Sequence, residues 1–250
     1  MRRVRYRYLR ILSILLAVIV WQMVGWLGVF PRHLLPWPTS VASSFVDLSV
    51  SGELPSHILT SLLRVAVGFI IAAATAVPLG IAISWSKVAE SLTEPILEIL
   101  RPIPPIAWIP IAMLWFGLGF KPAVFLIFIG AFFPILINTV AGVRATPKVL
   151  VEAVRTLGAS DRDILVKVVT PSAIPSVVAG LRIGVGVGWM CLVAAEMAGA
   201  SSGLGYMVIY YSGILETSSV MVGMLTIGAI GYAMSYGIER VEGRLLRWRE

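Results

Sequence analysis

Side chains that could carry out covalent or metal chemistry are scarce in this sequence of 250 residues. It holds two histidines, His33 and His57, and one cysteine, Cys191, which lies inside an apolar run. Glycine-rich loops that bind nucleotide phosphates end in Gly-Lys-Ser or Gly-Lys-Thr, but the glycine run at 184–188 has no such lysine. No nucleophile stands near a base, and no spacing fits a set of metal ligands. We therefore expect no catalysis, no metal and no bound cofactor in this chain.

The composition indicates a membrane protein. Hydrophobic residues make up 58% of the chain and charged residues 13%, which is about half the charged share of soluble domains. Apolar runs of roughly 20 residues, the length that crosses a bilayer, recur along the chain. We predict an all-α polytopic membrane protein with a single transmembrane domain over residues 1–250. Its six spans are predicted at about 11–30, 61–85, 102–118, 122–143, 173–197 and 220–238.

Positively charged residues predict how these spans are oriented. Six crossings place sixteen of the twenty Lys and Arg on one side, in the N-terminal segment, residues 87–101, residues 144–170 and the C-terminal tail. Segments rich in Lys and Arg stay in the cytoplasm. We therefore predict a multi-pass protein of the cell membrane (plasma or inner membrane) with both termini cytoplasmic.

Small residues recur every four positions on two of the spans. They form two ladders, which are Gly68, Ala72, Ala76 and Gly80 in the second span and Gly180, Gly184 and Gly188 in the fifth. Small residues at this spacing let helix backbones touch within lipid. The ladders predict either tight packing inside one bundle, or a subunit interface or pathway wall.

The cytoplasmic segment at about 147–170 has the pattern of two short helices. Apolar residues recur at helical spacing before and after a glycine, and they are Leu150, Ala153, Val154 and Leu157, then Ile164, Leu165, Val168 and Val169. Gly158 stands where a left-handed helix cap is expected. Ser160 and Asp163 are typical of the start of a second helix, and Pro171 is expected to end it.

Three interpretations fit this helical hairpin. A DNA-binding helix-turn-helix has the same outline, but membrane tethering and mixed charges argue against it, so no nucleic-acid partner is expected. The second interpretation is a solvated connector, although loops between helices are usually shorter. We favour the third, a docking element for a cytoplasmic partner, because two amphipathic helices can place one face on the membrane domain and leave the other free.

The hairpin also resembles a known motif, the Glu-Ala-Ala loop of ABC importer permeases. The residues that match its spacing are Glu152, Ala153, Gly158 and Pro171. Val154, Val168 and Thr170 stand where the motif usually has Ala, Ile and Leu. The flanking segments TSLLRVAVGF, LRPIPPIAWIPIAMLWFGLG and AAEMAGASSGLGYM resemble importers of nitrate, sulfonates, taurine and bicarbonate. From about Pro36 onward, the chain is therefore similar to a type I ABC importer permease with the MetI-like fold.

This resemblance implies a function and a set of partners. It implies the membrane-spanning subunit of an ATP-driven importer for a small, anionic solute, not an enzyme. The implied partners are a second permease copy (a homodimer), two cytoplasmic ATPases that bind ATP and magnesium, an extracytoplasmic solute-binding protein and the lipid bilayer. The residues expected to couple the ATPase to transport are Glu152, Ala153, Arg155, Gly158, Ala159 and Pro171.

Prolines crowd the first half of the third predicted span. Pro104, Pro105 and Pro110 each remove a backbone donor and collide with the preceding turn. Backbone carbonyls freed in this way must be buried in protein or line a watery cavity when they lie in a bilayer. We predict that residues 104–110, including Trp108, lie beside the pathway or at its cytoplasmic gate. A purely structural kink is the alternative.

Few charged residues lie at membrane depth. They are Arg64, Arg182 and Glu196, and such residues usually face the bundle and serve a function. Arg64 and Glu196 could instead extend to the membrane surface. We expect Arg182 to attract an anion or to pair with a carbonyl, and we place Glu196 and Asn138 on the pathway as well.

Two other functions stay open. An ion-coupled secondary transporter would need intramembrane carboxylates, and the predicted spans offer Glu196 for this role. A membrane enzyme would need clustered His, Asp or Glu at an interface, and the sequence shows no such cluster. The sequence therefore favours a permease over both.

Overall fold

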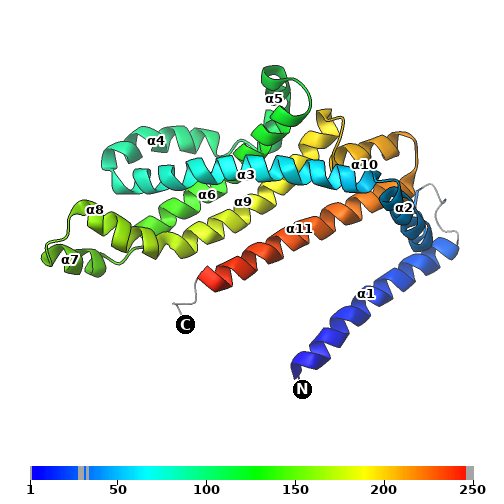
Figure 1. The fold of residues 1–250 in the computed structure, drawn as a ribbon, viewed down its shortest axis with the longest axis horizontal. Coiled ribbons are helices and arrows are strands. Elements are labelled where there is room, and N and C mark those ends of the chain that lie inside the picture. Colours follow the sequence, from blue (N-terminus) through cyan, green and yellow to red (C-terminus); the bar gives the residue numbers. More distant parts are fainter. Residues whose placement is uncertain (1, 28–30, 32–33, 246–250) are drawn as a thin grey trace.

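The computed structural model describes residues 2–27, 31 and 34–245, and the regular elements within them are all helical (Figure 1). They are α1 (Arg2–Trp26), α2 (Pro38–Val50), α3 (Glu53–Trp85), α4 (Lys87–Leu100), the 3-10 helix η1 (Pro105–Trp108), α5 (Ile109–Phe116), α6 (Phe120–Arg144), α7 (Lys148–Thr156), α8 (Asp161–Ile164), the π-helix η2 (Leu165–Val169), α9 (Thr170–Gly199), α10 (Leu204–Gly213) and α11 (Thr217–Leu245). The all-α prediction is confirmed.

Four helical segments of the described chain are long and apolar enough to cross a membrane. They are α3, α6, the continuous run Asp161–Gly199 and the part of α11 at Thr217–Arg240. These segments cover the second, fourth, fifth and sixth predicted spans. The first predicted span falls on α1, whose apolar part is the shorter helix Leu15–Trp26. Residues 28–30 of that prediction lie outside the described residues.

The third predicted span, at 102–118, is not one straight helix. α4 meets the segment Pro105–Phe116 at an angle of 86°, and the two have the length and composition of a membrane span only when taken together. The break falls around Pro102 and Pro104. Proline has no N–H to continue the helix, and its ring collides with the preceding turn. The pair is either a broken span that begins earlier than predicted, with α4 at Lys87, or a re-entrant loop.

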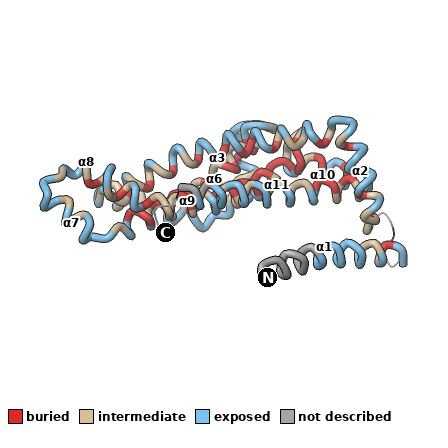
Figure 2. Tube along the Cα trace, turned by 60° about the horizontal axis from the view of Figure 1, so that its bottom comes forward, coloured by how far each residue is buried: buried red, intermediate tan, exposed pale blue. Residues whose placement is uncertain are grey.

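The bundle is elongated and carries different elements at its two ends (Figures 1 and 2). α7 and α8 project beyond the spans at one end, which we call the hairpin end. α2 and α10 lie at the other, which we call the opposite end. α9 runs from the hairpin to the opposite end, so it is the element that joins them.

One face of α6 packs against the ladder on α3. An added Cβ at Gly68 would come within 2.8 Å of Ile127 of α6, and one at Gly80 within 2.8 Å of Thr139. Ala72, between these glycines, is fully buried. Such distances leave no room for a larger side chain, so the α3 ladder is an intramolecular packing face.

The ladder on α9 packs against α6 as well. An added Cβ at Gly180 would come within 2.8 Å of Asn138, and one at Gly184 within 2.9 Å of Ile135 and 3.1 Å of the Ala131 carbonyl oxygen. Of the two predicted uses of the ladders, tight packing inside one bundle is therefore the one that the structure shows. α6 lies between two helices at backbone contact.

Substitution of Gly184 by Leu should destabilise the bundle. The larger side chain must push α9 away from α6, and overpacking of a close-packed core typically costs about 1–3 kcal/mol. Gly186→Leu is the matched control, because an added Cβ at Gly186 meets nothing within 4 Å. Thermal unfolding in detergent, monitored by size-exclusion chromatography, should show a lower unfolding midpoint for Gly184→Leu. The midpoint of Gly186→Leu should equal that of the unmodified protein. Equal midpoints for the two variants would contradict the packing role of this ladder.

Candidate functional site

A left-handed glycine joins the two helices of the hairpin. α7 ends at Thr156, and Gly158 follows with φ of 87°. The Gly158 N–H donates to the Arg155 carbonyl at 3.0 Å, and the Ala159 N–H donates to the Val154 carbonyl at 3.3 Å. This pair of bonds is a Schellman motif, which satisfies the last carbonyls of a helix. The predicted glycine cap is confirmed.

The second helix of the hairpin runs without a break into α9. Ser160 Oγ accepts a hydrogen bond from the Asp163 N–H at 3.2 Å and caps α8, as predicted. The prediction that Pro171 ends this helix is wrong, because Pro171 lies in the first turn of α9. The wider π-helical turn of η2 directly before it makes room for a ring that would collide with an α-helical turn. Within that wide turn, Thr170 Oγ1 donates to the Leu165 carbonyl at 2.8 Å.

One face of the hairpin packs on the spans and another is exposed. Ile164 and Val169 are buried in a cluster with residues of α6 and α9, and Val154 packs against it. The predicted apolar face of α7 is therefore wrong in part. Leu150 is exposed, and Leu157 at the tip is 85% exposed. The turn at Gly158 orients α7 so that Val154, and not Leu157, faces the second helix.

Charged side chains surround this exposed tip. Arg155 Nη2 lies 2.9 Å from Asp161 Oδ1, across the glycine turn, and Lys167 Nζ lies 2.6 Å from Asp163 Oδ1. Glu152 is exposed, and in the described part of the chain it has no ion pair. The hairpin thus presents an unpaired carboxylate together with exposed leucines, a combination suited to contact another protein.

Five of the six predicted coupling residues lie together in the hairpin, and they are Glu152, Ala153, Arg155, Gly158 and Ala159. Pro171 lies apart, exposed at the start of α9. Ala153 is exposed, whereas Ala159 packs against the buried cluster around Ile164. The hairpin residues therefore divide into a buried set that fixes its position and an exposed set that is free to bind.

The proline-rich break places Trp108 against the core. Pro104 caps η1, Pro105 begins it, and Pro110 lies in the first turn of α5. Trp108 packs edge-on against Phe125 of α6, with ring centroids 6.4 Å apart. Its indole Nε1 is buried, and none of the described residues offers it a hydrogen bond. A buried unsatisfied donor costs about 1–3 kcal/mol. A rearrangement of this segment that gave the indole N–H a hydrogen-bond partner would remove that cost.

Asn138 and Arg182 both have partners within the chain. Asn138 Nδ2 donates to the Pro134 carbonyl of its own helix at 2.8 Å. Arg182 lies near the middle of α9, in the half nearer the hairpin, and its guanidinium is 3.6 Å from Glu239 and 3.7 Å from Glu242 of α11. These two carboxylates offset the positive charge, so the predicted attraction of Arg182 for an anion is weakened.

Glu196 is buried in a polar cluster that links α9 to α3. Arg64 Nη1 lies 2.7 Å from Glu196 Oε1, and the Ser61 hydroxyl lies 2.8 and 2.9 Å from the two carboxylate oxygens. Glu196 is fully buried and Arg64 is 3% exposed. The alternative that these two side chains extend to the membrane surface is therefore wrong. We call Ser61, Arg64, Glu196 and Ser202 the Glu196 clamp.

The clamp also holds the N-terminus of α10. The Gly205 N–H donates to Glu196 Oε2 at 2.9 Å, and a negative charge is favourable at a helix N-terminus. Arg64 Nη1 donates to the Ser202 carbonyl at 2.6 Å, in the turn between α9 and α10. One buried ion pair thus ties three elements of the opposite end together, so Glu196 has a structural role here.

Two further hydrogen bonds attach α10 to α3. The Gly203 N–H donates to His57 Nδ1 at 3.0 Å, and Tyr211 Oη donates to the Glu53 carboxylate at 2.9 Å. Burial, with the neighbouring Glu53 carboxylate, raises the pKa of Tyr211 above its ordinary value, which keeps the hydroxyl protonated and able to donate.

The sequence analysis missed Ser61 and Ser202, because single serines near span ends form no pattern. Gly203 was a usable signal. Its φ is 108°, and an added Cβ would come within 2.2 Å of Glu196 Oε1. A glycine that follows a buried carboxylate in this way indicates a chain that turns back over that carboxylate.

Removal of the Glu196 carboxylate should destabilise the fold strongly. Glu196→Ala leaves Arg64 buried without its counter-ion, and breaking a buried pair in this way typically costs about 3–5 kcal/mol. Asp161→Ala is the control, because it breaks the exposed pair with Arg155, and exposed pairs contribute about 0–1 kcal/mol. Thermal unfolding of the detergent-purified protein measures both. Similar midpoints for the two variants would show that the clamp does not hold the opposite end.

Comparison with known proteins gives consistent matches along most of the chain. The family model described as "Binding-protein-dependent transport system inner membrane component" matches residues 74–245. A Methanocaldococcus jannaschii protein named as an ABC transporter permease is 42% identical, over 94% of this chain and 90% of its own. The SsuC permease of Bacillus subtilis, whose name assigns it to aliphatic sulfonates transport, is 36% identical, over 99% of this chain and 90% of its own. The taurine transport system permease TauC of Escherichia coli is 33% identical, over 99% and 94%.

The fold also matches solved structures. A chain of the MetNI methionine ABC transporter, in an inward facing conformation, superposes with a TM-score of 0.70 at 21% sequence identity. The match covers 79% of this chain and 98% of that chain. This likeness shows the fold, and it agrees with the expected MetI-like architecture. With the family model and the relatives, it shows that the chain belongs to the binding-protein-dependent transport system inner membrane components, the multi-pass permease subunits of ABC importers.

Proposed function

We propose that this permease moves a small solute with an anionic group, and that its hairpin receives the motion of separate ATPase subunits. Membership of the family makes the chain a transport subunit and not an enzyme. The relatives named for aliphatic sulfonates and for taurine support the solute class, because those compounds carry a sulfonate group. Nitrate and bicarbonate, suggested by the resemblance of the flanking segments, belong to the same class of small anions.

The hairpin is the observation that carries the coupling role. It projects beyond the spans at one end of the bundle (Figure 1), and its tip exposes Leu157. The adjoining carboxylate of Glu152 is exposed as well. An exposed leucine at the tip of a charged helical hairpin has no evident role in folding, but it would be buried in a docked complex. A cytoplasmic ATPase at this end would contact Glu152, Ala153 and Arg155.

This proposal includes an assembly and an orientation. A second permease copy, two ATPase subunits that bind ATP and magnesium, and an extracytoplasmic binding protein would complete the importer. The hairpin end and both termini would face the cytoplasm, and the binding protein would meet the opposite end, where α2 and α10 lie. The positive charge of the predicted cytoplasmic segments supports this orientation.

The proline-rich break is the proposed gate. Pro104, Pro105 and Pro110 bound a short 3-10 segment between α4 and α5, and no continuous hydrogen-bond ladder resists bending there. The buried indole N–H of Trp108 has no partner in the part of the chain that the structure describes, and it would gain one in another conformation of this segment. Asn138 and Arg182 stay candidates for the pathway, with the internal partners described above.

Ion-coupled transport is the alternative, and the geometry of Glu196 argues against it. A coupling carboxylate must exchange its ion or proton during the cycle. Glu196 Oε1 instead accepts a hydrogen bond from Arg64, and Oε2 accepts one from the Gly205 N–H. The Ser61 hydroxyl lies within 2.9 Å of both oxygens. A group held in this way is suited to fix helices and not to cycle between two ionisation states.

Cysteine labelling should confirm the proposed orientation. Ser160 in the hairpin and Lys121 at the start of α6 are both exposed. In a background in which Cys191 is replaced by Ala, a membrane-impermeant thiol reagent should label Lys121→Cys from outside intact cells. It should label Ser160→Cys only after the cells are opened. Labelling of Ser160→Cys from outside would overturn the orientation and the docking role together.

A side chain at Gly158 should uncouple transport. Valine at this left-handed position costs roughly 1–2 kcal/mol locally and re-aims α7. An added Cβ there meets nothing within 4 Å, so the spans should fold and insert normally. We expect Gly158→Val to lose co-purifying ATPase or to hydrolyse ATP without solute uptake.

Gly52→Val is the matched control for this experiment. Gly52 has φ of 79°, an added Cβ there also meets nothing within 4 Å, and it lies before α3 at the opposite end. It should keep the ATPase in the complex. If Gly158→Val imports solute at the rate of the unmodified protein with its ATPase bound, the hairpin is only a connector.

A further inference from the structure

The turn between α10 and α11 holds a leucine where a glycine is expected. The Leu215 N–H donates to the Ser212 carbonyl at 3.2 Å. The Glu216 N–H donates to the Tyr211 carbonyl at 3.0 Å. This is the same Schellman pair of bonds that closes α7, and Leu215 takes the position that Gly158 has there. Its φ is 60°, and it is the single non-glycine residue with a positive φ in the part of the chain that the structure describes.

This conformation is costly for leucine, and the fold gains little from it. A left-handed backbone brings the Cβ of an L-residue too close to the following carbonyl oxygen, so glycine would close the same turn at a lower cost. The Leu215 side chain is 72% exposed and that of Ile214 is 55% exposed, so packing does not offset the strain. Single exposed leucines are common on proteins, but strained residues cluster at functional sites. We call residues 214–216 the Leu215 turn.

The Leu215 turn is held firmly in place. It lies after α10 at the opposite end of the bundle (Figure 1). Ser219 Oγ donates to Glu216 Oε1 at 2.8 Å, and Tyr211 attaches the end of α10 to α3 through Glu53. The Glu196 clamp attaches the start of α10. A surface that is already fixed loses less conformational freedom when a partner binds.

The elements at this end are acidic. Residues 34–60 and 200–220, which include α2 and α10, contain no Lys or Arg. They contain Asp47, Glu53 and Glu216, and among the described residues no cation pairs with the exposed carboxylates of Asp47 and Glu216. Helices that bind membrane surfaces are rich in Lys and Arg on their polar face. A protein with a basic contact surface therefore fits the Leu215 turn better than a lipid surface does.

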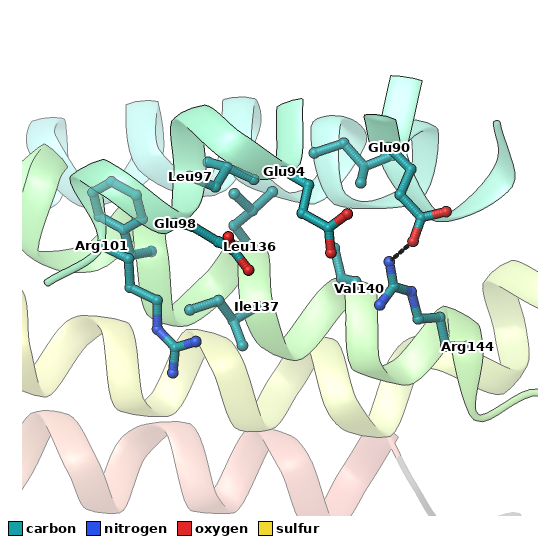
Figure 3. A pocket seen from close by; sticks show the side chains of 11 residues that line it. Glu90, Glu94, Leu97, Glu98, Arg101, Leu136, Ile137, Val140 and Arg144 are labelled. Carbon is teal, nitrogen blue, oxygen red and sulfur yellow. Dashed lines mark hydrogen bonds and ion pairs between the residues drawn. The ribbon is translucent and has the colours of Figure 1, made fainter. Parts of the chain in front are cut away.

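The acidic residues of α4 lie in a different setting. Arg101 and Arg144 line the same groove as the α4 carboxylates, and Arg144 forms an ion pair with Glu90 (Figure 3). Arginines of this chain thus offset part of the acidic charge beside α4. No Lys or Arg does so within the segments 34–60 and 200–220, so the acidic charge there is left for a partner to neutralise.

We infer that the Leu215 turn is a contact site for the extracytoplasmic binding protein, which would bury Ile214 and Leu215 in an apolar depression rimmed by basic side chains. An apolar centre with a polar rim is the usual anatomy of protein interfaces. The inference rests on the proposed function in identifying the partner, because the binding protein is the partner expected at the opposite end.

The position of α10 connects this contact to the spans. α10 begins at the Glu196 clamp, which joins it to α9. α9 continues through η2 into the hairpin. A binding protein that displaces the Leu215 turn therefore acts on the helix that carries the hairpin, and its binding should raise ATP hydrolysis by the attached ATPases.

Three substitutions of Leu215 separate the contact from the strain. Leu215→Gly removes the side chain and the strain, Leu215→Ala removes the side chain alone, and Leu215→Met keeps a long apolar side chain. Leu92→Ala is the control, because Leu92 is 68% exposed on α4, away from this surface. Each variant is made in the complete transporter in lipid nanodiscs. The affinity of the purified binding protein is measured by surface plasmon resonance, and the unfolding midpoint by thermal denaturation.

We expect Leu215→Gly and Leu215→Ala to bind the binding protein about tenfold or more weakly, because burial of a leucine side chain contributes at least this much affinity. Leu215→Met and Leu92→Ala should bind it as the unmodified transporter does. The unfolding midpoint of Leu215→Gly should be no lower than that of the unmodified protein, since glycine relieves the strain.

Three results would overturn this inference. Unchanged affinity in Leu215→Gly would show that the side chain makes no contact. Weaker binding by Leu215→Gly but not by Leu215→Ala would mean that turn flexibility, and not the side chain, affects binding. A lower unfolding midpoint for Leu215→Gly would show that the leucine serves the fold.

Thiol protection distinguishes the binding protein from lipid as the partner. In a Cys191→Ala background, Leu215→Cys should react rapidly with a membrane-impermeant thiol reagent, and about tenfold more slowly when the binding protein is present at a saturating concentration. Slow reaction without the binding protein would place the turn in lipid, and lack of protection would place it outside the interface, so either result contradicts the inference. If the unmodified transporter binds no binding protein, the proposed function fails instead.

Discussion

Backbone contact on both sides of α6 is the constraint on which the rest of the bundle depends. Glycines of α3 and of α9 lie so close to α6 that an added Cβ at Gly68, Gly80 or Gly180 would come within 2.8 Å of an α6 side chain. Helices in lipid gain no hydrophobic drive for association, so close packing of this kind provides much of their attraction. Because interfaces of this density do not deform gradually, α3, α6 and α9 should move as one unit.

α9 connects this unit to both ends of the molecule. At the hairpin end it continues through η2 into α8, so the exposed tip around Leu157 is joined to a spanning helix through the Gly158 turn. At the opposite end Glu196 fastens it to Arg64 of α3 and to the start of α10. α4 and α5 stand outside this arrangement, since prolines interrupt the helix between them. A rigid α3–α6–α9 unit with an adjustable α4–α5 pair is a reasonable basis for opening and closing a path.

Patterns of local origin could be predicted from the sequence, and those that depend on contacts between distant segments could not. The glycine cap at Gly158 and the serine cap at Ser160 follow from backbone geometry that nearby residues determine. The passage of the helix through Pro171 was mispredicted because a π-helical turn relieves the collision that proline usually causes. The pairing of Arg64 with Glu196 joins residues 132 positions apart, and no spacing rule connects them. α4 was not predicted, because residues 87–101 were assigned to a cytoplasmic segment, and α4 and Pro105–Phe116 have the length and composition of a span only when taken together.

The central claim is that the hairpin and α9 move together when the ATPases act. Electron paramagnetic resonance distances between spin labels at Arg162 in α8 and Met190 in α9, both exposed, test it most directly in the complete transporter. The account predicts the same Arg162–Met190 distance in the nucleotide-free and ATP-bound states, while the distance between the Arg162 labels of the two copies changes. A change within one chain as large as the change between copies would contradict it, because the hairpin would then bend at the π-helical segment without moving the spans.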